Sequence, residues 1–189
     1  MGRAAVAPAL ERLDAPLTDG QIVLRDWRAS DADALIEPLN DPDIARWTRV
    51  PSPYTRADAE EFLALRAARA DRGEALTLAI ASAASDEPLG SIALKVTSPE
   101  NGRGEIGYLV FPAARGGGVG ARAVRLLARH GLERAGLRRI EILTATTNVA
   151  SQRVAERAGF TREGLLRSYT ANKGHRDDMV MWSLLPGDL

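Results

Sequence analysis

The feature that most constrains this chain is a run of glycines, Arg115-Gly-Gly-Gly-Val-Gly120, between a predicted strand and a predicted helix. Residues 105–111 before it are rich in β-branched and aromatic side chains, and the residues after it have the apolar spacing of an amphipathic helix. Glycines at a helix start leave backbone N–H groups without internal partners and let a ligand approach them closely. The helix dipole adds positive potential there. The segment therefore predicts a site for a phosphate or pyrophosphate group.

The alternative is a ligand-free turn, although three consecutive glycines at a helix start are costly for stability. A Walker loop would end in Gly-Lys-Ser/Thr, whereas this loop continues as Val119-Gly-Ala-Arg122. Residues 118–123 do fit the G-x-G-x-x-A fingerprint of dinucleotide-binding folds. That fold requires a parallel sheet and an acidic residue at the end of the next strand, but Glu141 falls near its start. A nicotinamide-dependent oxidoreductase is therefore the weaker interpretation.

The composition limits the classes of protein that remain. With 189 residues, 45% of them hydrophobic, the chain can form one domain with a sizeable core. Its 25 basic and 25 acidic residues balance, without a basic block, so we expect no nucleic-acid partner. The apolar stretches are short and interrupted by charges, which predicts a cytoplasmic protein with no membrane partner. The sequence has no cysteine, which excludes thiol nucleophiles, and His130 and His175 alone do not suggest a metal site.

The periodicity of the chain predicts groups of strands and helices. Strands are expected at residues 22–25, 76–81, 89–96, 105–111, 139–144, 160–169 and 176–184. Helices are expected at residues 31–39, from 41, from an N-cap at Thr55, from 116 to about 136, and at 148–158. Turn residues favour an antiparallel meander over residues 76–111 and a hairpin at Asn172-Lys-Gly174. We expect a flexible arm of residues 1–19 and a single domain of residues 20–189, with one mixed sheet and helices on both faces.

Several motifs, in order along the chain, resemble the GNAT superfamily of N-acetyltransferases. Arg115-x-x-Gly118-x-Gly120 is similar to its Q/R-x-x-G-x-G/A signature. A later motif of the superfamily resembles Asn148-x-x-Ser151-x-x-Val154-x-Glu156-x-x-Gly159-Phe160. Other pieces resemble the branch typified by the ribosomal-protein acetyltransferases RimJ and RimL: Leu24-Arg25, Asn40-Asp-Pro-Asp43, Glu105-Ile-Gly-Tyr108, Glu163-Gly164 with Arg167, and Gly174-x-x-Asp177. The resemblance covers about residues 20–185.

This resemblance implies an α/β (α+β mixed) fold, with a mostly antiparallel sheet of six to seven strands. It also implies acetyl-CoA as co-substrate, with no metal. In the superfamily the strand before the loop separates from its neighbour and pairs with the pantetheine arm, while the loop amides hold the pyrophosphate. The coenzyme-binding residues would then be Tyr108, Leu109, Val110, Arg115, Gly116, Gly117, Gly118, Val119, Gly120, Ala121, Asn148 and Ser151.

The reaction that the resemblance implies is direct attack of a neutral amine on the thioester carbonyl. It needs a base for the ammonium proton, a donor that polarises the carbonyl and an acid for the leaving thiolate. Glu105 is the candidate base, through water, and a solvent-facing carboxylate is the alternative. Ser151 is the candidate acid or orienting group, and a serine bonded to backbone is the alternative. Asn148 also suits a plain helix N-cap, and Ala155 stands where many members carry a tyrosine acid.

The acceptor is less well defined by the sequence. The resemblance places Trp47, Arg49 and Tyr54 near the acceptor groove, although Trp47 also suits a core position. Asp177 and Asp178 could meet a cationic amine, or they could be solvated residues of a hairpin. The acceptor would be a protein N-terminal α-amine or a small-molecule amine, and the resemblance suggests a homodimer. A non-catalytic acyl-CoA-binding sensor remains an alternative, favoured by the missing tyrosine acid.

Overall fold

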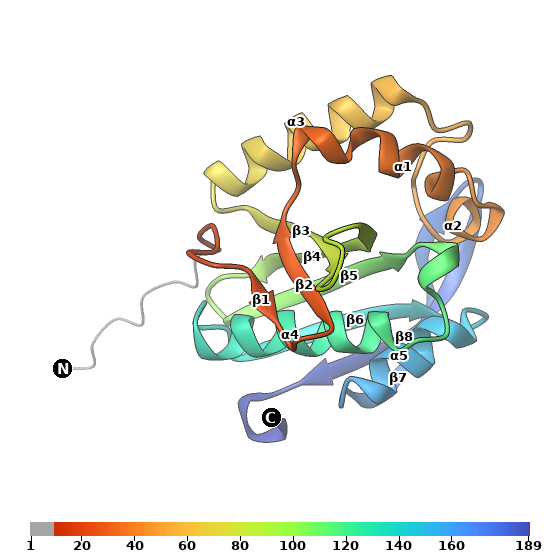
Figure 1. Cartoon of the computed structure of the whole chain (residues 1–189). Helices are drawn as coiled ribbons and strands as arrows, with labels where there is room; N and C mark the ends of the chain where they lie inside the picture. Colours follow the sequence, from red (N-terminus) through yellow and green to blue (C-terminus); the bar gives the residue numbers. More distant parts are fainter. Residues whose placement is uncertain (1–9) are drawn as a thin grey trace.

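The computed structural model describes residues 10–189 (Figure 1). Its strands are β1 (Leu17–Thr18), β2 (Ile22–Asp26), β3 (Ala75–Ser82), β4 (Pro88–Ser98), β5 (Arg103–Val110), β6 (Arg139–Ala145), β7 (Thr161–Asn172) and β8 (His175–Leu184). Its helices are α1 (Ala32–Leu39), α2 (Pro42–Trp47), α3 (Arg56–Asp71), α4 (Val119–Glu133) and α5 (Val149–Arg157). Short 3₁₀ turns are found at Ala29–Asp31, Pro112–Ala114 and Pro186–Asp188.

The strands form one sheet in the order β1-β2-β3-β4-β5-β6-β8-β7. Neighbouring strands are antiparallel except for β5 and β6, which are parallel. The predicted mixed, mostly antiparallel sheet is therefore confirmed. The strand count of six to seven was too low, because the sheet formed by residues 10–189 has eight strands. The missed strand is β1, whose two residues pair with β2 and are too few to show a periodic pattern.

The predicted flexible arm is corrected where the structure describes it. Leu10 is only 1% exposed and belongs to the main hydrophobic core, and β1 extends the sheet at Leu17–Thr18. Arg12 forms ion pairs with Asp26 and Asp71, which join this segment to β2 and α3. Residues 10–19 therefore pack on the domain, whereas residues 1–9 of the predicted arm lie outside the described residues.

Helices cover both faces of the sheet, as predicted, with α1 and α3 on one side and α4 and α5 on the other (Figure 1). Alternate strand residues such as Leu78, Leu94 and Ile106 pack against the apolar stripe of α4 in the larger core. The opposite side holds a smaller core of α1, α2 and α3, which includes Leu35 and Phe111. The two cores place one hydrophobic layer on each side of the central strands.

Local chemistry explains where α3 begins. The predicted N-cap Thr55 is confirmed: its side chain accepts from the Asp58 backbone N–H, and the Asp58 carboxylate accepts from the Thr55 N–H at 2.8 Å. This reciprocal arrangement satisfies two donors at the helix start.

No helix within residues 10–189 is long and apolar enough to cross a bilayer.

Candidate active site

The sheet opens between its two central parallel strands. β5 pairs with β6 only at Arg103↔Arg139, Gly104↔Ile140 and Glu105↔Glu141, and the ladder between them then ends. Beyond this point β5 stays paired with β4 as far as Val110, and β6 stays paired with β8 as far as Ala145. The predicted separation is therefore present. It leaves the backbone of residues 106–110 without a partner strand on the β6 side.

The glycine loop lies directly after this opening. The 3₁₀ turn Pro112–Ala114 leads into the loop, and Gly118, with φ 78°, is the N-cap of α4. The Arg115 amide donates to the Pro112 carbonyl at 3.2 Å, and the Arg122 amide donates to the Gly118 carbonyl at 3.1 Å. Between these two, the backbone amides of residues 116–121 have no hydrogen-bond acceptor anywhere in residues 10–189. The predicted row of free donors is therefore present.

Space above the loop is open. A Cβ atom added to Gly116, Gly117 or Gly118 would meet no heavy atom within 4 Å. A cavity of about 500 Å³ adjoins the loop, and its lining residues are Asp19, Gly117, Gly118, Ala121, Arg122, Arg125, Leu126, Arg129 and Arg157. Unpaired amides, an open approach and arginine side chains together suit a phosphate-bearing ligand.

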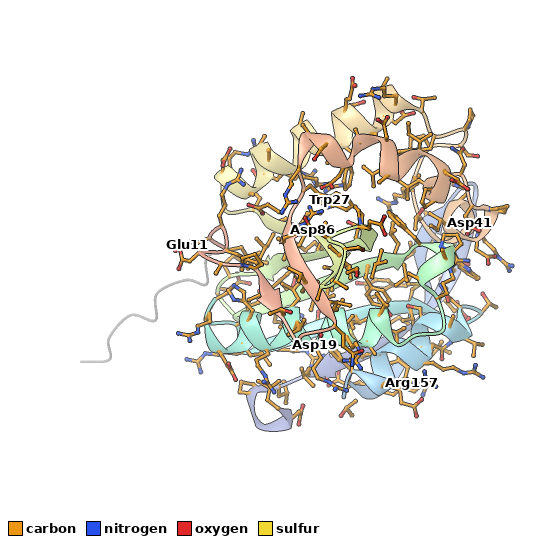
Figure 2. All side chains as sticks on the ribbon, viewed as in Figure 1. Glu11, Asp19, Trp27, Asp41, Asp86 and Arg157 are labelled. Carbon is orange, nitrogen blue, oxygen red and sulfur yellow. The ribbon has the colours of Figure 1, made fainter. Side chains whose placement is uncertain are left out.

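Arg115, the first residue of the predicted signature, contacts the start of α2. Its guanidinium lies 2.7 Å from Asp41 Oδ1 and 3.5 Å from Asp43 Oδ2, and its Nε donates to the Val110 carbonyl at 3.3 Å. Asp41 is also the N-cap of α2, and its hydrogen bond from Arg115 lowers its pKa. Arg115 therefore fixes the loop against α2, where Figure 2 labels Asp41. The sequence analysis did not predict this contact.

Asn148 and Ser151 meet at the start of α5. The Asn148 Oδ1 atom accepts from the Ser151 amide at 3.0 Å, so the N-cap interpretation is confirmed. The Nδ2 donor of Asn148 has no partner among the described residues and can still reach a ligand. Ala155, about one turn further along α5 than Ser151, is completely buried in the main core. A larger side chain at that position would point into the core.

The hydroxyl of Tyr108 makes a contact that the sequence analysis did not assign. It lies 2.8 Å from Ser151 Oγ and 3.0 Å from the Ser151 carbonyl, and so joins β5 to the first turn of α5. Burial raises the pKa of Tyr108 to about 12, although the hydrogen bond with Ser151 opposes the shift. The phenol therefore stays protonated and can donate to the serine oxygen. Because the two residues are 43 positions apart, no local pattern could have predicted the pair.

Glu105 lies at the base of the opening, as the last β5 residue paired with β6. It shares its face of the strand with Gly107 and Leu109, as predicted, and this face looks toward the α1–α3 side. Its carboxylate forms an ion pair with Lys95 at 2.9 Å and keeps 26% of its side-chain surface exposed. Glu105 and the Tyr108–Ser151 pair thus lie on opposite faces of β5.

The residues expected at the acceptor groove differ in how far they are buried. Tyr54 is buried in the smaller core, with its hydroxyl unpaired among the described residues, so it does not line an open groove. Trp47 is partly buried beneath the Arg46 guanidinium, which lies 4.5 Å from the ring centroid, and Arg49 is exposed. Asp177 pairs with His175 at 3.3 Å.

Asp178 accepts from the Ser168 amide at 2.6 Å, in agreement with the hairpin interpretation. In residues 10–189 no three His, Cys, Asp or Glu side chains form a group that could hold a metal ion.

The free amides at the start of α4 and the unpaired edge of β5 are features that the sequence resemblance predicts for a GNAT acetyltransferase. The comparisons agree, since residues 21–161 match the family described as the Acetyltransferase (GNAT) domain. The chain therefore belongs to the GNAT acetyltransferase family, and the predicted resemblance is confirmed.

Individual relatives fall within the same group. The uncharacterised N-acetyltransferase p20 of Bacillus licheniformis is 31% identical over 166 residues, which cover 87% of this chain and 93% of p20. The ribosomal-protein-serine acetyltransferase of Escherichia coli (strain K12) is 32% identical over 98 residues, 52% of this chain and 55% of that protein. RimJ of Mycobacterium smegmatis, solved in complex with CoA-disulfide, shares the fold with a TM-score of 0.82 at 24% identity; the match covers 93% of this chain and 88% of RimJ.

Proposed function

We propose that this GNAT family member uses acetyl-CoA to acetylate a primary amine, either a protein N-terminal α-amine or the amine of a small molecule. The observation that carries the proposal is the row of unpaired amides at residues 116–121 beside the opening of β5 and β6. A diphosphate would satisfy several of these donors at once and would lie at the positive end of the α4 dipole. The CoA-disulfide complex of the RimJ relative supports the same choice of ligand.

Different parts of the chain would bind different parts of the coenzyme. The amides of Gly116 to Ala121 hold the diphosphate, and the edge of β5 at residues 108–110 pairs with the amide groups of the pantetheine arm. Asn148 Nδ2 donates to that arm while its Oδ1 atom remains the N-cap of α5. Arg115 acts indirectly, because its ion pairs to Asp41 and Asp43 hold the loop in place.

Glu105 is the proposed base. It takes the ammonium proton of the acceptor through water, and the neutral nitrogen then attacks the carbonyl carbon of the thioester. As the new carbon–nitrogen bond forms, the carbon–sulfur bond breaks and coenzyme A leaves as a thiolate. The exposed surface of Glu105 and its position at the base of the opening support this role. Lys95, paired with Glu105 at 2.9 Å, holds the carboxylate in place.

Ser151 is proposed to stabilise the leaving thiolate. When Tyr108 donates to Ser151 Oγ, the serine's own hydrogen is free to point into the opening and donate to sulfur. The thiolate then takes its proton from water. This arrangement would replace the tyrosine acid that the chain lacks at Ala155.

The test is titration calorimetry with acetyl-CoA and with NAD, followed by an assay of thiol release with a panel of N-terminal peptides and small amines. We expect acetyl-CoA to bind, NAD not to bind, and at least one amine to cause thiol release. Tight acetyl-CoA binding without thiol release for any amine would favour the sensor interpretation. Binding of NAD in place of acetyl-CoA would contradict the proposal.

A further inference from the structure

Small residues leave part of the sheet uncovered on its α1–α3 side. Thr77, Ala93 and Gly107 are register partners on β3, β4 and β5, and they lie on the same face as Glu105. Gly107 is exposed and Ala93 is half-buried. A Cβ atom added to Gly107 would meet no heavy atom within 4 Å. The helical layer therefore leaves the middle of β4 and β5 open next to the proposed base.

Four buried polar atoms on this side of the sheet have no hydrogen-bond partner in residues 10–189. They are Trp27 Nε1, the Tyr54 hydroxyl, Arg66 Nε and Thr77 Oγ1. Tyr54 is 4% exposed and Thr77 is 9% exposed, so both side chains are shielded from bulk water. Buried polar groups are normally paired, because an unpaired one costs free energy. Four unpaired groups in one region therefore indicate a site for a polar ligand.

Ring contacts and strand register bring these groups together. The Trp27 and Phe62 rings are 5.8 Å apart, and the Arg66 guanidinium carbon lies 4.9 Å from the centroid of the same Phe62 ring. β2 pairs with β3 as far as Leu78, so Trp27, which follows β2, lies near Thr77. Figure 2 shows Trp27 between the sheet and the layer of α1 and α3. The unpaired groups thus lie at the inner end of the uncovered face.

Arg66 brings a positive charge that no carboxylate of residues 10–189 balances, since it forms neither an ion pair nor a hydrogen bond there. Burial lowers the pKa of Arg66 and the charge of Arg69 lowers it further, whereas Tyr54 opposes the shift. Arg25, on the same side of the sheet, instead pairs with Asp31 at 2.8 Å. An anion that entered beside Arg66 would supply the missing charge.

The chemistry of the four groups indicates which anion fits. The Trp27 indole and the Arg66 guanidinium can only donate, and the hydroxyls of Tyr54 and Thr77 can donate as well. Burial raises the pKa of Tyr54 to about 12, so its hydroxyl keeps its proton. Several donors around one cation suit a carboxylate. Their shielded position suits the end of a small molecule better than a continuing protein chain.

We infer that the acceptor is a small amine carrying a carboxylate, and that this carboxylate binds beside Arg66 while the amine lies near Glu105. This substrate class rests on the proposed function and deepens it. Neighbouring strands are about 4.8 Å apart, so Thr77 lies roughly 10 Å from Gly107 across the sheet. The amine and the carboxylate are therefore separated by a chain of several bonds. Nitrogen gains the acetyl carbon as the carbon–sulfur bond breaks, which gives an N-acetyl carboxylate and coenzyme A.

The experiment measures kcat/KM for thiol release with straight-chain ω-amino carboxylates of increasing length, each compared with its own carboxamide. The wild-type chain should prefer the best carboxylate to its amide by about 10-fold or more, as expected for a charge-assisted contact. Arg66→Gln should remove this preference and leave kcat/KM for the amide almost unchanged. Arg56→Gln is the matched control and should keep the preference, because Arg56 lies on the same helix but is exposed and paired with Asp33 and Glu60.

Thr77→Val supplies a second variant that does not depend on Arg66. Valine has a similar shape and removes an unpaired hydroxyl, so the melting temperature should stay the same or rise while the carboxylate preference falls several-fold. Equal wild-type kcat/KM for carboxylates and amides, or an equal loss of both in Arg66→Gln, would overturn the substrate class and leave the proposed function intact. A carboxylate preference confined to acidic peptide N-termini would also overturn it. Absence of thiol release with every amine would instead contradict the proposed function.

Discussion

Gly117 is a position where the coenzyme site can be tested without disturbing the fold. Its φ is not in the left-handed region, and an added Cβ would contact no atom within 4 Å. Gly117→Ala should therefore leave the melting temperature unchanged or slightly raised. The methyl group would lie among the free amides, so we expect acetyl-CoA affinity, measured by calorimetry, to fall about 10-fold or more.

Gly164 provides the control, because it is also free of close contacts and lies on β7, away from the loop. Gly164→Ala should keep wild-type affinity. Undiminished binding by Gly117→Ala would show that the diphosphate does not approach this backbone.

The ion pair of Glu105 and Lys95 allows the role of Glu105 as the base to be tested with single-residue variants. If Glu105 is the base, Glu105→Gln should lower kcat about 100-fold and leave acetyl-CoA affinity unchanged. If the carboxylate serves only its 2.9 Å ion pair, Lys95→Met should have the same effect as Glu105→Gln. We expect steady-state kinetics to show a large loss for Glu105→Gln and a small one for Lys95→Met. An unchanged kcat in Glu105→Gln would remove Glu105 from the mechanism.

Features that depend on residues close together in the sequence could be predicted from the sequence alone. The glycine loop, the Thr55 and Asn148 caps and the face occupied by Glu105 all follow from local spacing. Contacts between distant segments could not be predicted. Arg115 and Asp41 are 74 positions apart, so only the folded chain shows that the signature arginine binds α2.

Among the elements, β2 and its connections depend on one buried cation. Arg25 is 4% exposed and forms ion pairs with buried Asp31 at 2.8 Å and with Asp86 at 2.7 Å. These contacts join β2 to the 3₁₀ turn before α1 and to the β3–β4 turn. Asp31→Ala leaves Arg25 without its buried partner and should lower the free energy of unfolding by about 3–5 kcal/mol.

Urea unfolding would measure this loss. The control is Asp33→Ala, which removes the exposed ion pair with Arg56 and should cost less than about 1 kcal/mol. A similar small loss for Asp31→Ala would contradict the role of the buried pair.

The strands β6, β7 and β8 are joined by a network around Glu163. Hydrogen bonds from Arg139 and Ser183 lower the pKa of Glu163 from 4.5 to about 2. A carboxyl group whose pKa is lower in the folded state stabilises the fold at pH values above its pKa in the unfolded state. This contribution is lost as the pH falls from about 4.5 toward 2. Glu163→Gln should be less stable at neutral pH and lose less stability on acidification. Unfolding curves at several pH values would test this, and parallel pH profiles would contradict it.

For the whole molecule, the sequence predicted the mixed sheet and helices on both faces because both depend on periodicity. It missed β1 and the packing of Leu10, because a two-residue strand and one buried side chain carry no periodic signal. The opening between β5 and β6 came from the family resemblance, since strand separation is set by which ladders form across the sheet. In our account the coenzyme enters this opening from the α4 side, and Glu105 meets the acceptor on the α1–α3 side.

The central claim is that the amides of residues 116–121 bind the diphosphate of acetyl-CoA. The most direct test is an NMR titration of ¹⁵N-labelled protein, with chemical shifts and hydrogen exchange followed for each of these amides. We predict that saturating acetyl-CoA shifts these signals and slows their exchange more than at the start of any other helix. Saturable binding of acetyl-CoA that leaves the six amides unchanged would contradict the account.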